Sequence, residues 1–200
     1  PNEILISKNN IKFNKLKSKS IIGTSSYRRE YQLKQIRKDL SYKLIRGNVD
    51  TRIKKLNEGL YDAIILSKAG IDSLNLNNHI TQEFSIEEII PSAGQGVIAV
   101  QCRNDDKDIK EILKKINHEE TNTCCIAERE LLKTLEGDCN TAIGAISIVD
   151  QNTITLNVEL FSKDGKKRYF IKNSKELSLA KELGNEIDEL LKKKSKGSYK

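Results

Sequence analysis

The stretch Ile21-Ile22-Gly23-Thr24-Ser25-Ser26-Tyr27-Arg28-Arg29 sets the fold of the first half of the chain. Two β-branched residues run into a glycine and three hydroxyl residues, and apolar residues at helical spacing follow to about residue 38. This order predicts a strand, a tight polar turn and a helix. It returns one unit later, with a strand over 42–45, a turn over 46–48 and a helix over 49–57, before a buried strand over 62–66. Strands that alternate with helices in this way predict a doubly wound parallel sheet with right-handed crossovers.

The second half of the chain has a different pattern. Residues 91–96 combine a proline with two glycines and indicate a hinge, and the strand-like stretch 97–101 follows. Apolar residues at helical spacing predict packing helices over 106–116 and 119–135. Alternating apolar residues and turn signals then predict three antiparallel strands within 142–173. A last helix should face inward with Ala180, Leu183, Ile187 and Leu190, which completes a small α+β domain.

Basic residues are concentrated at the start of the chain. The 200 residues carry 35 Lys and Arg against 28 Asp and Glu, a net charge of +7, and residues 1–60 hold 15 of the basic and 5 of the acidic residues. A basic stretch suits nucleic acid, an anionic membrane surface or a small polyacidic ligand. Stacking aromatic or zinc motifs do not accompany it, so nucleic acid is not expected. The lysines of this stretch are predicted to form a solvated approach surface: Lys8, Lys12, Lys15, Lys17 and Lys19.

Composition also bounds the compartment. Apolar runs of the roughly 18 to 20 residues that span a membrane are missing, and the start of the chain lacks a signal-peptide pattern, so we expect a cytoplasmic protein. The spacing of the four cysteines and two histidines does not suit a zinc site, and reduced thiols are expected. The sequence contains no methionine, even at position 1, and is therefore expected to be the later part of a longer protein.

The two turns that follow the first strands are predicted to bind an anion. A glycine and hydroxyl turn at a helix N-terminus offers N–H and O–H donors and the positive end of the helix dipole. Both turns should open at the same sheet edge, so that Arg28, Arg29, Arg46 and Arg52 converge on one crevice. The planar guanidinium group binds a carboxylate with two hydrogen bonds. The alternative for each arginine is a surface charge in an ion pair worth about 0 to 1 kcal/mol.

A cysteine in a loop adds a candidate nucleophile. Cys139 follows Leu-Glu-Gly-Asp after the helix over 119–135, and such a position favours an accessible thiol, although most single cysteines are inert. A papain-like triad gains no support, because neither histidine is near it in sequence.

These motifs together resemble one family. Gly-Thr-Ser-Ser-x-Arg-Arg at 23–29, Arg-Gly-Asn-Val-x-Thr-Arg at 46–52, Tyr-Asp-Ala-Ile-Ile-Leu at 61–66, Gly-Gln-Gly at 94–96, Ala-Glu-Arg at 127–129 and Leu-Glu-Gly-x-Cys at 135–139 resemble, in order and spacing, porphobilinogen deaminase, also called hydroxymethylbilane synthase. The resemblance implies a monomeric transferase of tetrapyrrole (haem) biosynthesis. Such an enzyme condenses four molecules of its small-molecule substrate, porphobilinogen, into linear hydroxymethylbilane and releases ammonia.

The resemblance also implies a fold and roles for residues. It implies a periplasmic-binding-protein-like α/β domain over 1–92, a hinge with a returning strand and helix over 93–116, and a C-terminal α+β domain over 117–200. Cys139 matches the cysteine that holds the dipyrromethane cofactor through a thioether. The other residues expected to contact the cofactor are Ser25, Ser26, Arg28, Arg29, Arg46, Gly47 and Arg52, and those expected to contact substrate are Thr24, Arg28, Arg46, Arg52 and Gln95.

Some family features are missing from these 200 residues. The family's catalytic aspartate would precede Pro1, so the chain alone is expected to be inactive. Ser73 stands where many members carry an arginine, and Asp138 replaces a common glycine. The alternative from another functional class is a non-enzymatic anion-binding or effector domain of the periplasmic-binding type, which binds without chemistry.

Overall fold

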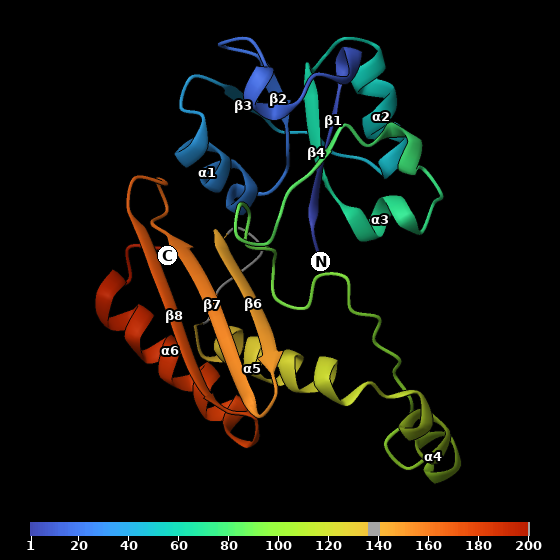
Figure 1. Ribbon diagram of the computed structural model, residues 1–200, viewed down its shortest axis with the longest axis vertical. Coiled ribbons are helices and arrows are strands. Elements are labelled where there is room, and N and C mark those ends of the chain that lie inside the picture. The colour runs from blue at the N-terminus through green and yellow to red at the C-terminus, as the bar shows by residue number, and fades with distance from the viewer. Residues whose placement is uncertain (136–140, 200) are drawn as a thin grey trace.

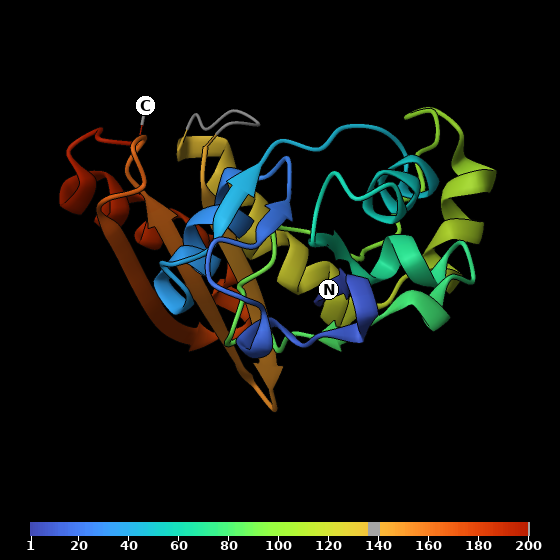
Figure 2. The same ribbon diagram turned by 90° about the horizontal axis from the view of Figure 1, so that it is seen from above.

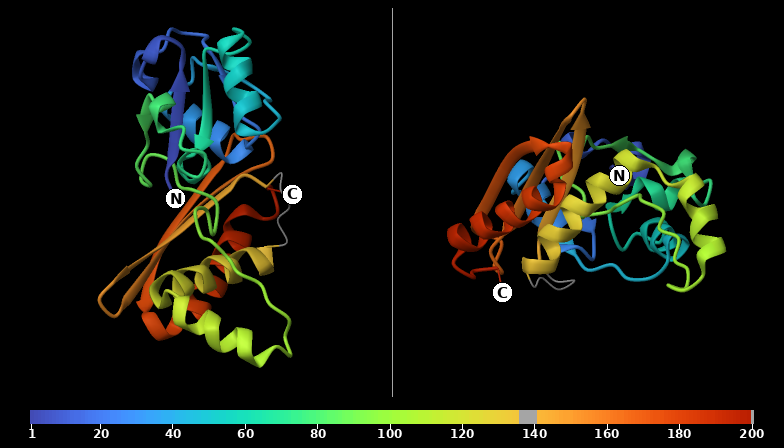
Figure 3. Two further views of the ribbon diagram at one scale, coloured as in Figure 1. Left: turned by 90° about the vertical axis from the view of Figure 1, so that its right-hand side faces the viewer. Right: turned by 90° about the horizontal axis from the view of Figure 1, so that it is seen from below.

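The computed structural model describes residues 1–135 and 141–199. These residues form two units joined near the turn at 91–96, and Figure 1 shows them along the long axis of the molecule. The first unit is a five-stranded sheet with helices on both faces, and the second is a three-stranded antiparallel sheet covered by two helices. Figure 3 shows the same two units from the side and from below. This is the predicted order of an α/β unit followed by an α+β unit.

The first sheet is mixed. Its strands are β1 (Glu3–Ser7), β2 (Ile21–Gly23), β3 (Ser41–Lys43), β4 (Ala63–Ser67) and β5 (Gln82–Glu83), in the order β3-β2-β4-β1-β5. The strands β2, β3 and β4 are parallel to one another, as their spacing predicted. However, β1 pairs antiparallel with β4, and β5 pairs antiparallel with β1. The prediction of a parallel sheet therefore holds only for the three strands from which it was made.

Helices cover both faces of this sheet, as a doubly wound fold requires. Helix α1 (Tyr27–Ile36) lies on one face, and α2 (Val49–Asn57) and α3 (Lys68–Asp72) lie on the other. Because successive side chains of a strand point to opposite faces, β1 and β4 supply both apolar clusters. The cluster under α1 includes Leu5, Ile22, Leu33, Ala63 and Ile65, and the cluster under α2 and α3 includes Ile4, Ile6, Ile53, Leu56, Ile64, Leu66 and Ile71. The described chain also contains short 3₁₀ turns over Lys8–Asn10, Phe13–Lys15, Asn77–His79 and Leu177–Leu179.

The second unit confirms the predicted antiparallel meander. Strands β6 (Ile143–Asp150), β7 (Thr153–Phe161) and β8 (Arg168–Glu176) pair in sequence, and α5 (Glu119–Leu135) and α6 (Ala180–Ser195) cover one face. The apolar residues that alternate along β7 are fully buried, as the period of two predicts: Ile154, Leu156, Val158 and Leu160.

One residue of the last helix was predicted wrongly. Ala180, Leu183 and Ile187 are buried as predicted, but Leu190 is 36% exposed, and the buried position is Leu191. A spacing of four residues from Ile187 keeps Leu191 on the inner face of a helix with 3.6 residues per turn, whereas a spacing of three turns Leu190 toward its rim.

The segment after the hinge differs most from expectation. Residues 97–101 form no strand in the described chain, and Ile98 is 90% exposed. Helix α4 (Lys107–Ile116) forms where expected, with Asp106 as its N-cap, but it buries none of its residues and stands at the side of the molecule in Figures 1 and 2. The predicted apolar residues therefore lie on one helix, but they do not pack against the described part of the chain. None of the helices in the described ranges is both long and apolar enough to cross a membrane.

Candidate functional site

The site is built where β1 meets the start of α1. Because β1 runs antiparallel to β4, its first residue, Glu3, lies beside Ser67 at the carboxyl ends of the parallel strands. Helix α1 begins at this same edge, directly after β2 and its polar turn. The result is a buried ionic cluster: Glu3 Oε1 lies 2.6 Å from Arg28 Nη2, and Glu3 Oε2 lies 2.8 Å from Arg29 Nη2.

Electrostatics within this cluster favour its charged form. Burial by itself raises the pKa of Glu3, but the charges of Arg29 and Arg28 outweigh it and hold that pKa below its ordinary value. Burial lowers the pKa of Arg28, and the attraction of Glu3 opposes this shift. One carboxylate faces two guanidinium groups, so the cluster keeps a net positive charge.

Arg28 is a buried structural centre of the site. Its side chain is 6% exposed, its Nη1 donates to the carbonyl oxygen of Ile90 at 2.8 Å, and its Nη2 donates to Gln95 Oε1 at 3.3 Å. Gln95 in turn donates through Nε2 to Glu3 Oε1 at 3.1 Å and to the carbonyl oxygen of Pro1. The alternative of a weakly paired surface charge is therefore wrong for Arg28, which is held on several sides.

The hydroxyl turn before α1 is organised by its own side chains. Thr24 Oγ1 accepts a hydrogen bond from the backbone N–H of Ser26 at 3.2 Å, and Ser26 Oγ accepts one from the N–H of Arg29 at 3.4 Å, as an N-cap does. Thr24 is buried, whereas Ser25 is exposed. The hydroxyl groups of Thr24 and Ser26 thus fix the backbone of the turn and of the start of α1, where Arg28 and Arg29 lie.

The second predicted turn lies beside the first. Gly47 has a φ of 118°, and its carbonyl oxygen accepts a hydrogen bond from Arg52 Nε at 2.7 Å. Burial lowers the pKa of Arg52, and the positive charge of Arg29 lowers it further. Arg29 and Arg52 are therefore near enough to repel each other, and an anion near both would relieve this repulsion. Arg46 is exposed.

A cleft of about 350 Å³ opens beside this cluster. Its polar wall contains four of the residues nominated from sequence, Ser26, Arg28, Arg29 and Gln95, while Arg46 and Arg52, both within the described chain, are not part of its lining. The opposite wall comes from the second unit and was missed by sequence reasoning. The remaining lining residues are Ser92, Ala93, Leu132, Thr141, Ile143 and Ala145.

Cys139, the nominated attachment residue, lies outside the described residues, as does Asp138. Thr141, which lines the cleft, is two positions after Cys139 in the chain. Ser73 is exposed at the end of α3, and its Oγ donates to the carbonyl oxygen of Ala69 at 2.8 Å.

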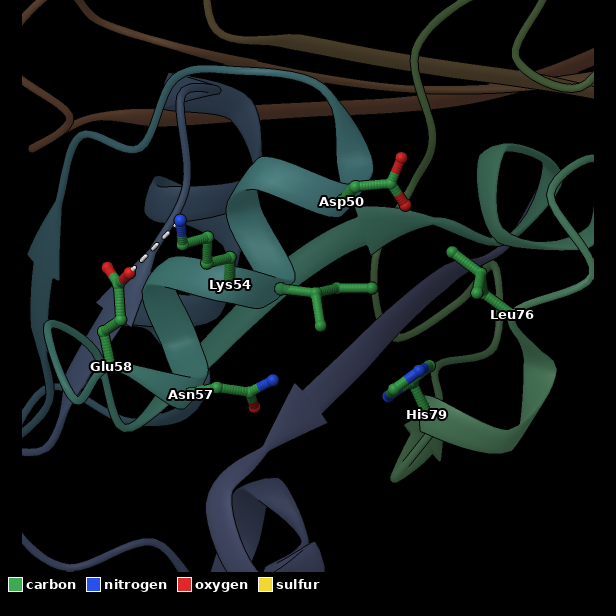
Figure 4. Close-up of a pocket in the computed structure, with 7 residues that line it drawn as sticks. Asp50, Lys54, Asn57, Glu58, Leu76 and His79 are labelled. Carbon is green, nitrogen blue, oxygen red and sulfur yellow. Dashed lines mark ion pairs between the residues drawn. The ribbon is translucent and has the colours of Figure 1, made fainter.

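A larger hollow of about 480 Å³ lies between α2 and the Asn77–His79 turn (Figure 4). Charges of both signs line it, and Lys54 Nζ lies 3.9 Å from Glu58 Oε1 within it. Asp50 and His79 complete its polar lining together with Asn57. This mixed lining does not form a positive cradle, so the smaller cleft is the better anion site.

Comparison with known proteins agrees with the geometry. Residues 1–111 match a family model described as "Porphobilinogen deaminase, dipyromethane cofactor binding domain", and residues 122–193 match "Porphobilinogen deaminase, C-terminal domain". The chain belongs to the porphobilinogen deaminase family. The family resemblance stated from the sequence motifs is thereby confirmed, and the fold agrees with the domain architecture of this family.

Curated porphobilinogen deaminases align over most of the chain. That of Coxiella burnetii (strain RSA 493 / Nine Mile phase I) is 42% identical over 166 residues, which are 83% of this chain and 53% of the relative. That of Desulforamulus reducens is 41% identical over 191 residues, 96% of this chain and 62% of the relative. That of Brevibacillus brevis is 39% identical over 170 residues, 84% and 55%. The chain thus spans between about half and three fifths of the length of these relatives.

Proposed function

We propose that this chain is the anion-binding and cofactor-carrying part of a porphobilinogen deaminase, the transferase that condenses four porphobilinogen molecules into hydroxymethylbilane with release of ammonia. The observation that carries the proposal is the ionic cluster at the cleft, where one buried glutamate faces two arginines and leaves a net positive charge. Porphobilinogen carries two acidic arms, so a growing pyrrole chain is a polycarboxylate. Guanidinium groups in a half-buried cleft suit such a ligand because charge-assisted bonds strengthen away from bulk water.

The arginines divide into two roles in this proposal. Arg28, which is buried against Glu3 and Ile90, fixes the frame of the site. Arg29 and Arg52 carry positive charge that the frame does not neutralise completely, and they contact acidic arms. Arg46, which is exposed after β3, is proposed to receive further arms of the substrate. The residues Thr24, Ser25, Ser26, Gly47 and Gln95 complete the proposed contacts through hydroxyl, backbone and amide groups.

The residues of the cleft fit a dipyrromethane. Its polar wall offers Ser26 and Arg29 for carboxylates, and its other wall offers the small or apolar side chains of Leu132, Ile143 and Ala145 for the faces of pyrrole rings. Cys139 is the proposed attachment point, since a thiolate is the side chain that forms a thioether with an electrophilic pyrrole. When bound, the dipyrromethane supplies the pyrrole carbon to which substrate units are joined.

We also propose the boundaries 1–92, 93–116 and 117–200 for the α/β domain, the hinge with its returning segment, and the C-terminal domain. The buried clusters support this division, because those of the first sheet end at Ile89 and that of the second begins with Ala127, with Ala93 packed against it. From the family resemblance and the composition, we further propose that the enzyme is monomeric and cytoplasmic and that it binds neither nucleic acid nor a membrane. The non-enzymatic anion-binding module is not favoured, because both family models describe porphobilinogen deaminase.

The proposal is tested by incubating the complete gene product with porphobilinogen. We expect ammonia release and formation of hydroxymethylbilane, and we expect Cys139→Ser to abolish both. Binding of porphobilinogen without ammonia release would support the non-enzymatic module instead. Normal consumption of porphobilinogen by Cys139→Ser would show that the attachment residue is assigned wrongly.

A further inference from the structure

A buried glutamate outside the arginine cluster ties the hinge to the second unit. Glu128 lies on α5 and is 3% exposed. Its Oε2 accepts a hydrogen bond from the backbone N–H of Gly94 at 2.7 Å, and its Oε1 accepts one from the N–H of Ser147 at 2.7 Å. One carboxylate thus joins three segments, namely α5, the hinge turn and β6.

A carboxylate suits this position for a chemical reason. Two backbone N–H donors converge on the side chain, and an ionised carboxylate is the side chain with two acceptor oxygens and no donor. Burial raises the pKa of Glu128, and the hydrogen bonds from Gly94 and Ser147 oppose this shift. The turn itself needs its glycine for backbone conformation, since Gly94 has a φ of 70° and open space where a side chain would be.

The hinge turn leads directly to the ionic cluster. Gln95 follows Gly94, and its Oε1 accepts hydrogen bonds from Arg28 Nη2 at 3.3 Å and from Ser92 Oγ at 3.1 Å. Its Nε2 donates to Glu3 Oε1 at 3.1 Å. The position of the turn therefore sets where the Gln95 amide stands between the carboxylate and the guanidinium group.

We propose that Glu128 is a positioning residue for the acid-binding cleft: it holds the turn around Gly94 so that Gln95 keeps Arg28 and Glu3 in the arrangement that receives the acidic arms. This inference rests on the proposed function and extends it to a residue that does not line the cleft. Glu128 acts on affinity rather than on bond making. Its loss should raise KM and leave kcat nearly unchanged, because the binding energy lost would be the same for the bound substrate and for the transition state.

The test compares Glu128→Gln with Glu120→Gln in the complete, cofactor-loaded gene product. The amide at position 128 keeps the size of the side chain but turns one acceptor into a donor that faces an N–H. We expect KM for porphobilinogen to rise about tenfold, the effect of about 1.4 kcal/mol. Glu120 is exposed on the first turn of the same helix, and its variant removes the same charge and should leave KM unchanged. A reduced kcat at unchanged KM would mean that Glu128 is only structural and would overturn the proposal.

Two further measurements keep the proposal testable if Glu128→Gln folds poorly. In a Gln95→Ala background, Glu128→Gln should change KM little, because the route through Gln95 is already lost; a full and additive effect would contradict that route. Gly94→Ala strains the turn at the residue that donates to Glu128, because alanine disfavours a positive φ, and it should also raise KM. An unchanged KM would contradict the role of the turn in positioning Gln95.

Hydrogen exchange separates this inference from the proposed function. Glu128→Gln should accelerate hydrogen exchange of the Gly94 amide, and unchanged exchange would show that Glu128 does not hold the turn, even in an active enzyme. If the wild-type gene product fails to consume porphobilinogen while Glu128→Gln still accelerates exchange at Gly94, the proposed function is wrong but the role of Glu128 in holding the turn is supported.

Discussion

The Arg28→Met substitution tests whether the ionic cluster is the frame of the site. It replaces a buried guanidinium group by an apolar chain of similar length and leaves Glu3, whose side chain is fully buried, with one fewer positive neighbour. Removing one partner of a buried ion pair costs about 3–5 kcal/mol. Glu3 keeps Arg29 at 2.8 Å and Gln95 at 3.1 Å, so we expect the lower end, about 3 kcal/mol. For a protein of this size, that corresponds to a fall in Tm of about 6–12 °C.

Urea unfolding at pH 7, followed by circular dichroism, measures this loss. Glu3→Gln alone should also destabilise strongly, because it leaves the buried guanidinium group of Arg28 and the partly buried one of Arg29 without their carboxylate. The double variant should then cost about 2 kcal/mol less than the sum of the two single variants. Lys34→Met on the same helix removes a partly exposed i,i+4 pair with Glu30 and the contacts of this ammonium group with the rings of Tyr31 and Tyr42, and it should cost about 1 kcal/mol or less. Additivity of Arg28→Met and Glu3→Gln within about 0.5 kcal/mol would show that the two side chains are not coupled and that the ionic cluster does not frame the site.

Three further outcomes are expected. Arg46→Gln should leave the free energy of unfolding within about 0.5 kcal/mol of wild type, because Arg46 is exposed. It should slow consumption of porphobilinogen, because it removes a charge that is proposed to receive an acidic arm; unchanged turnover would remove Arg46 from the site. The stability advantage of wild type over Glu3→Gln should be complete above about pH 4.3 and vanish as the pH falls through the lowered folded-state pKa of Glu3, and an advantage independent of pH would contradict the ion pairs. Gly184→Ala on α6 should destabilise the protein by about 1–2 kcal/mol despite better helix propensity, since the added carbon would lie 2.4 Å from the carbonyl oxygen of Ala127 on α5. Denaturant unfolding measures this change, and a stabilised variant would show that α5 and α6 can move apart at no cost.

Local pattern was enough to predict most elements of the fold. The helix over 49–57 begins and ends where the pattern placed it, and the next long helix begins at residue 119 as predicted, because apolar residues at helical spacing run through both and Gly59 follows the first. Strand β1 was missed, since its five residues are buried on both sides and show no alternation. The strand expected over 97–101 is absent from the described chain because a strand needs a neighbour to pair with, and sequence cannot show whether one is present.

The candidate site was predicted in part. The turn over 23–29 pointed to the residues Ser26, Arg28 and Arg29, and the structure places all three in the lining of one cleft. The sequence did not show that Glu3 would neutralise part of their charge, because that contact depends on the antiparallel direction of β1. Glu128 was missed as well, although one signal was present. It lies four residues after Cys124 on the apolar stripe of its helix, where a glutamate indicates a buried acceptor.

Intact-mass analysis of the complete gene product, purified under cofactor-loading conditions, measures whether Cys139 carries a dipyrromethane. We expect a mass above that of the bare polypeptide by one covalently bound dipyrromethane, and stepwise additions of porphobilinogen less ammonia when substrate is supplied. For Cys139→Ser we expect the bare mass. A wild-type protein that keeps the bare polypeptide mass, or a Cys139→Ser variant that carries the same adduct, would show that the cofactor is not attached at Cys139.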